Sequence, residues 1–135
     1  MRSWVMVFAV VLLVSGCPLV AMDYWAALSE LESGNDDCAV GAAGEISRYQ
    51  IRQEVWRRLA PAEADWQNPH HACTVAWEIM KERCRNFERA YSRPPTPFEF
   101  YVLWNAPAQI LAPSPVVRER AERFVNLVSD TDTDG

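Results

Sequence analysis

The sequence predicts an all-α protein with about five helices arranged around a long central helix. Two observations carry this prediction. Apolar residues recur at three- and four-residue spacing in several segments, and capping residues or prolines stand where those segments begin. Alternation of apolar and polar residues, which would indicate strands, nowhere extends beyond a few residues. The chain of 135 residues has the size of a single domain.

The first 21 residues have the composition of an export signal, which leaves a domain at 22–129. Met1-Arg2 supplies a positive start, and the apolar run Trp4–Val14 is short for a membrane span. Two cleavage sites remain open. Val14-Ser15-Gly16-Cys17 fits a bacterial lipobox, which would remove 1–16 and acylate Cys17, whereas Leu19-Val20-Ala21 fits a conventional site. Both predict an exported protein in the periplasm or cell envelope, anchored to the membrane in the first case.

The first helix of the domain is predicted from Asp23, a capping residue, to Leu31. Gly34-Asn35-Asp36-Asp37 then stops it, and a loop rich in glycine and alanine runs to Gly44. A second helix is predicted from Arg48 to Leu59, where Pro61 ends it.

The longest periodic run begins at Asn68-Pro69, a capping residue followed by a proline suited to the first helical turn. We expect this helix, which extends to Tyr91, to be the buried spine of the domain. Thr96-Pro97-Phe98-Glu99 is a capping box that opens a helix to Asn105. Ser114-Pro115 starts a last helix, Val116–Val128, and 130–135 is predicted to be an acidic tail. The apolar face of the long helix consists of Ala72, Val75, Ala76, Ile79, Met80, Arg83, Phe87 and Tyr91.

The net charge of −5 argues against nucleic acid as a partner, because binding to phosphates needs clustered basic residues. An exported protein can form disulfides. Cys73 and Cys84 lie eleven residues apart on one predicted helix, about 16 Å from each other, which is too far for a bridge. Either Cys38 pairs with one of them, or all three are free thiols. We expect no cofactor and no metal, since the side chains of the adjacent His70 and His71 point apart on a helix.

Glu32-Ser33-Gly34 places one carboxylate at the end of a predicted helix, before a loop of small residues that leads to Gln50-Ile51. This stretch resembles the first motif of the lytic transglycosylases, which have a lysozyme-like fold. That motif reads Glu-Ser-Gly, about ten loop residues, then Gly-x-x-Gly-Leu-Met-Gln. The family's Gly-Leu-Met is here Ser47-Arg48-Tyr49. The residues in register are Glu32, Ser33, Gly34, Ala39, Val40, Ala43, Gly44, Gln50 and Ile51.

The resemblance covers roughly 25–128. The segment Tyr101-Val102-Leu103-Trp104-Asn105-Ala106 resembles the family's Ala-Tyr-Asn-Ala-Gly motif, and Phe124-Val125 resembles its terminal Tyr-Val pair. Trp104 and Phe124 stand where the family has tyrosines, and Pro107 stands where it has a glycine. In the family those tyrosines help to hold the catalytic glutamate or the substrate.

The resemblance implies cleavage of the β-1,4 bond between N-acetylmuramic acid and N-acetylglucosamine in peptidoglycan, with Glu32 as the single catalytic acid. Such an acid needs a pKa raised by burial. A true hydrolase of the same bond would need a second carboxylate, for which Glu45 is the candidate. Asp36 and Asp37 are discounted as turn formers. A cell-wall binding protein that lacks activity is the alternative from another class.

The predicted partner is therefore the glycan strand of peptidoglycan, bound by a monomer. Neutral amides can orient sugars without competing for the proton, and aromatic rings can stack on sugar faces. The predicted substrate-binding residues are Ser33, Tyr49, Gln50, Trp104 and Asn105.

Overall fold

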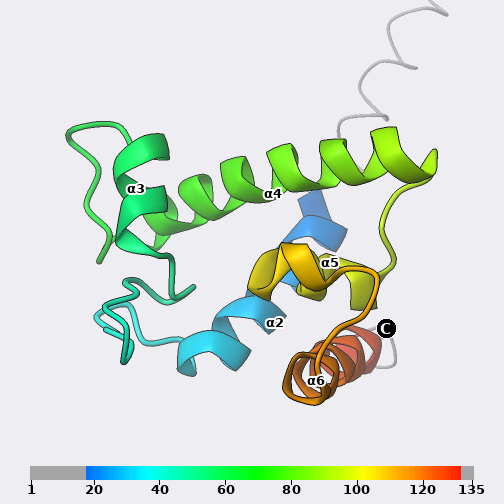
Figure 1. The fold of residues 1–135 in the computed structure, drawn as a ribbon. Helices are drawn as coiled ribbons and strands as arrows, with labels where there is room; N and C mark the ends of the chain where they lie inside the picture. The colour runs from blue at the N-terminus through cyan, green and yellow to red at the C-terminus, as the bar shows by residue number, and fades with distance from the viewer. Residues whose placement is uncertain (1–17, 132–135) are drawn as a thin grey trace, which may run out of the picture.

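The computed structural model describes residues 18–131, which contain five α-helices, one short 3-10 helix and no strand (Figure 1). The all-α prediction is thus confirmed. Cys17, the remainder of 1–17, and 132–135 at the end of the predicted tail lie outside the described residues. In the described part, no helix is both long and apolar enough to cross a membrane. The helices are α2 (Pro18–Ser33), α3 (Gln53–Leu59), α4 (Pro69–Tyr91), α5 (Pro97–Asn105) and α6 (Pro115–Thr131), with the 3-10 helix η1 at Pro107–Gln109.

Helix α5 lies at the centre, between α4 on one side and α2 and α6 on the other (Figure 1). Its five consecutive residues Phe100–Trp104 are all buried. The prediction that the long helix from Asn68-Pro69 is the buried spine holds for one face only, because α4 buries a single apolar stripe. A helix that is apolar on all sides, such as α5, shows no apolar periodicity in its sequence. The periodic pattern therefore identified the amphipathic α4, and not the enclosed α5, as the core helix.

The predicted helix starts are confirmed at α4 and α5. The side chain of Asn68 accepts hydrogen bonds from the backbone N–H groups of His70 (2.9 Å) and His71 (3.3 Å). Thr96 and Glu99 form the reciprocal capping box at the start of α5. Several boundaries differ from the prediction. Helix α2 begins at Pro18, before the predicted cap, and α6 continues past Val128 to Thr131, into the predicted tail.

Helix α2 ends where its glycine signal predicts. Gly34 has a φ of 65°, a left-handed conformation that glycine adopts without strain, and its N–H donates to the carbonyl of Glu30 (2.9 Å). The Ser33 hydroxyl accepts from the N–H of Asp36 (3.1 Å) and donates to the carbonyl of Arg48 (2.7 Å). The end of α2 is therefore tied to a loop segment fifteen residues further along the chain.

The prediction of a helix from Arg48 is wrong, because α3 starts at Gln53. The backbone groups of Ile46 and Ile51 pair in both directions at 2.8 Å and close a tight turn between them. Within this turn, Ser47 and Gln50 have φ values of 74° and 54°, which an α-helix does not allow. Ile46 and Ile51 are both buried in the core, so this turn is held by contacts that no local pattern reveals.

The thiols of Cys38, Cys73 and Cys84 are all free. Of the alternatives left open by the sequence, the structure has the one without a bridge. Burial raises the pKa of the Cys84 thiol to about 11, so this group is a neutral, partly buried side chain.

Candidate active site

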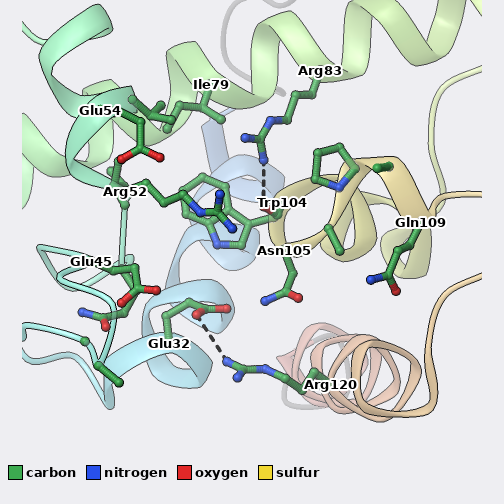
Figure 2. A pocket seen from close by; sticks show the side chains of 18 residues that line it. Glu32, Glu45, Arg52, Glu54, Ile79, Arg83, Trp104, Asn105, Gln109 and Arg120 are labelled. Carbon is green, nitrogen blue, oxygen red and sulfur yellow. Dashed lines mark hydrogen bonds and ion pairs between the residues drawn. The ribbon is translucent and has the colours of Figure 1, made fainter.

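A cleft of about 710 Å³ lies beside the end of α2 (Figure 2). Its walls come from the loop after α2, the start of α3, the inner face of α4, the end of α5 and one residue of α6. Five of the predicted site residues line it, namely Glu32, Glu45, Gln50, Trp104 and Asn105. Further charged groups on its walls, which the sequence analysis did not assign to a site, are Arg52, Glu54, Arg83 and Arg120.

The carboxyl group of Glu32 is held by two side chains from distant parts of the chain. The hydroxyl of Tyr101, on α5, donates to Oε1 (2.7 Å), and Nη2 of Arg120, on α6, lies 3.2 Å from Oε2 (Figure 2). Nε of Arg120 also donates to the Tyr101 hydroxyl (2.8 Å). The three groups form a closed network, in which the Glu32 side chain is only 8% exposed.

The pKa of Glu32 is raised above its usual value, and burial is the largest cause. The Tyr101 hydrogen bond and the charge of Arg120 oppose this shift, whereas the negative charge of Glu45 adds to it. Burial thus outweighs the ion pair. A carboxyl group with a raised pKa retains its proton closer to neutral pH, as a general acid requires.

The two oxygens of Glu32 have different surroundings. A proton on Oε2 leaves Oε1 able to accept from Tyr101, whose own pKa is raised by burial and by the negative charge of Glu32. Tyr101 therefore remains a donor in both protonation states of Glu32. The guanidinium of Arg120 has only donors, so a proton on Oε2 removes the ion pair and weakens the contact between Arg120 and that oxygen. The Arg120 side chain is 36% exposed, which leaves it room to move away.

If Glu32 is the catalytic acid that the sequence predicts, replacing Arg120 by glutamine is expected to move the alkaline limb of the pH–activity profile to higher pH. Arg120 lowers the pKa of Glu32, so its loss raises that pKa further. An acid catalyst loses activity as the pH rises through its pKa, and the loss would then begin at a higher pH. The measurement is the pH dependence of kcat/KM for glycan cleavage. Arg118→Gln, an exposed arginine on the same helix, is the control. An unchanged alkaline limb in Arg120→Gln contradicts the assignment of Glu32 as the acid.

The loop 41–50 brings Glu45 and Gln50 to the cleft wall over Gly41. The carboxyl end of Glu45 and the amide end of Gln50 both lie over Gly41, in space that a Cβ at this position would occupy, so a larger residue here would displace these two side chains. Glu45 Oε2 accepts from the N–H of Ala43 (3.1 Å), and the Gln50 side-chain amide donates to the carbonyl of Ser47 (3.1 Å). Both polar groups are therefore oriented by their own loop.

Trp104 and Asn105 reach the cleft from the last turn of α5. Trp104 is 8% exposed, and its ring packs against Tyr49. The amide of Asn105 is exposed and lies 3.5 Å from the Tyr101 hydroxyl. The carbonyls of Leu103 and Trp104 both accept from Nη1 of Arg83 at 2.7 Å, which holds this end of α5 against α4.

Two predicted substrate-binding residues do not line the cleft. Tyr49 is 3% exposed, with its ring between Trp25 and Trp104 in the core. Burial and an adjacent Cys73 raise the pKa of Tyr49. The Ser33 hydroxyl is hydrogen-bonded to the backbone of Asp36 and Arg48 in the loop after α2. Both residues support the cleft wall from behind and are not placed to contact a ligand.

Tyr101 and Arg120 are the site residues that sequence reasoning missed. Tyr101 stands four residues before Asn105 on one helix, so its position on the same face could have been found from the spacing. Arg120 is one of several charged residues on an amphipathic helix, and no local signal separates it from Arg118 or Arg123.

Among the described residues, no group of three or more histidine, cysteine, aspartate or glutamate side chains is arranged to hold a metal ion. His71, which the sequence analysis considered as a ligand, accepts at Nδ1 from the N–H of Asp65 (2.9 Å) and so stabilises the turn before α4.

Comparison of the chain with models of protein families, with curated proteins and with solved structures finds no match.

Proposed function

We propose that this protein is a peptidoglycan lytic transglycosylase with a lysozyme-like fold, and that Glu32 is its single catalytic acid and base. One observation carries the proposal. The glutamate of the motif that resembles this family lies on the wall of a cleft, is 8% exposed, and has a raised pKa and a tyrosine donor on one oxygen. This is the environment that proton delivery to a glycosidic oxygen requires.

In the proposed reaction, protonated Glu32 gives its proton to the oxygen between the two sugars, and the bond from that oxygen to the muramic C1 breaks. The resulting carboxylate then takes the proton of the C6 hydroxyl of the same muramic acid. O6 forms a bond to C1, which closes a 1,6-anhydro ring and restores protonated Glu32. Tyr101 stabilises the carboxylate between the two steps. No water is consumed.

The polar groups around Glu32 are suited to hold the sugars. Gln50 and Asn105 are neutral amides that line the same cleft as Glu32. Each can donate to and accept from hydroxyl or acetamido groups without competing for the proton. Trp104, labelled in Figure 2 on the wall of this cleft, adds a small apolar surface.

A hydrolase of the same bond is the second candidate, and the position of Glu45 favours it. Glu45 lines the same cleft, and its charge contributes to the raised pKa of Glu32. A second carboxylate in the same cleft is the group that a hydrolase needs to activate water or to hold an intermediate.

The products of digestion separate the candidates. Purified peptidoglycan is incubated with the protein, and the soluble fragments are analysed by mass spectrometry before and after treatment with borohydride. We expect muropeptides that are lighter by one water than their hydrolytic counterparts and that resist reduction. Glu45→Gln should then lower the rate only modestly, through substrate positioning.

Reducible ends as the main product, together with a steep loss of rate in Glu45→Gln, would establish the hydrolase instead. The absence of any fragment, with retained binding to cell walls, would contradict both and leave a binding protein.

We also propose export to the cell envelope, which follows from the predicted signal and agrees with this substrate.

A further inference from the structure

Two arginines line the α3 and α4 side of the cleft. Arg52 immediately precedes α3, and Arg83 points from the inner face of α4 toward the same space (Figure 2). Burial is the largest cause that lowers the pKa of Arg83, and the positive charges of Arg58 and Arg52 lower it further. The cleft therefore holds two cations of like charge on one wall.

Neither guanidinium is fully used by the protein. Nη1 of Arg83 donates to the two carbonyls at the end of α5. Within the described residues, Nε and Nη2 of Arg83 make no hydrogen bond. Arg52 forms no side-chain hydrogen bond and no ion pair in this part of the chain. Donors of both residues are thus available to a ligand in the cleft.

Carboxylates also line the cleft, but none of them pairs with these two arginines. Glu54 makes no ion pair with Arg52 or Arg83 among the described residues. Glu82, whose negative charge acts on Arg83, is itself paired with Arg58 at 3.3 Å. Arg52 and Arg83 therefore present guanidinium donors on the α3 and α4 side of the cleft without a carboxylate partner among the described residues.

We propose that Arg52 and Arg83 bind a carboxylate of the glycan substrate and so select acidic muramyl units. Guanidinium groups donate paired hydrogen bonds to planar carboxylates, and this geometry gives specificity as well as affinity. The inference takes the peptidoglycan substrate from the proposed function and adds which substituent the cleft recognises. Muramic acid differs from N-acetylglucosamine by a lactyl group, whose carboxylate is free when no peptide is attached. Attached peptides carry carboxylates of their own.

The preference is tested by calorimetric binding to three glycan fragments of equal sugar length. One has a free lactyl carboxylate, one has that group as a neutral methyl amide, and one carries a stem peptide with free carboxylates. All proteins carry Glu32→Gln to prevent turnover. We expect one or both acidic fragments to bind about tenfold more tightly than the neutral one, the size expected of charge-assisted hydrogen bonds. The fragment with the lower Kd identifies the source of the carboxylate.

Arg52→Gln should reduce this ratio to near one, because Arg52 is exposed and its loss removes charge without removing a contact within the protein. Arg57→Gln is the matched control, since Arg57 is an exposed arginine on α3 that does not line the cleft. It should keep the full ratio. Equal binding of acidic and neutral fragments, or an unchanged ratio in Arg52→Gln, would overturn the inference.

A neutral chitin oligosaccharide distinguishes this failure from failure of the proposed function. If the chitin fragment and the neutral muramyl fragment bind alike in all variants but no acidic fragment is preferred, only the role of the arginines is wrong. If no sugar binds at any concentration, the glycan substrate itself is wrong, and this inference is overturned with it.

Discussion

Glu32→Gln is expected to lower the rate of glycan cleavage by at least ~10²–10⁴-fold, the range for loss of a positioned acid or base. Glutamine preserves the shape of the side chain and can still accept from the Tyr101 hydroxyl, but it carries no transferable proton. Fold and glycan binding should persist. The measurements are the rate of release of soluble muropeptides, the Tm and the affinity for glycan.

Glu30→Gln is the control for this variant. Glu30 lies on the same helix, is exposed, and accepts from the Asn35 amide at 2.6 Å outside the cleft. Its replacement should leave the rate within a factor of a few. Near-normal cleavage by Glu32→Gln would remove the catalytic assignment, and with it the transglycosylase mechanism.

Phe124→Ala is expected to lower the free energy of unfolding by ~3–5 kcal/mol. The Phe124 side chain is fully buried. The centroid of its ring lies 5.7 Å from the ring centroid of Phe100, 5.6 Å from that of Tyr101 and 5.5 Å from that of Tyr24. Its removal leaves a cavity where α2, α5 and α6 meet. The ring of Tyr101 loses the surface behind it, so cleavage should fall as well. Urea denaturation measures the first effect and muropeptide release the second.

Leu111→Ala provides the comparison, because Leu111 is 82% exposed and its loss should change the free energy of unfolding by less than ~0.5 kcal/mol. If Phe124→Ala unfolds at the same urea concentration as the wild-type protein, the described core around Tyr101 is wrong.

Two positions of this chain differ from the tyrosines of the lytic transglycosylase motifs that it resembles, and they affect the surroundings of Glu32. Trp104 and Phe124 stand where the family has tyrosines, and neither can donate a hydroxyl to Glu32. The hydroxyl comes instead from Tyr101, nearly one helical turn before Trp104. Phe124 packs against the Tyr101 ring from the far side, as an apolar support. A donor to the glutamate is thus present, although the motif position that predicts it is occupied by another residue.

Helix ends were predictable because their causes are local. Asn68 caps the N–H groups of residues two and three positions ahead, and Gly34 adopts its positive φ whatever lies across the fold. The start of α3 was not predictable in this way. Pairing of Ile46 with Ile51 depends on the burial of both side chains in the core, which overrides the helical spacing of the segment from Arg48.

The helical class, the end of the helix at Glu32-Ser33-Gly34 and the loop that begins after it could be predicted from the sequence, because they follow from spacing and turn chemistry. The extension of that loop through Gln50 and the environment of the Glu32 carboxyl group depend on the packed fold. Its two partners lie 69 and 88 residues away in the chain, and the burial that raises its pKa comes from helices that assemble around it. The pKa of a carboxyl group depends on solvent exclusion and nearby charge, and both are properties of the packed molecule.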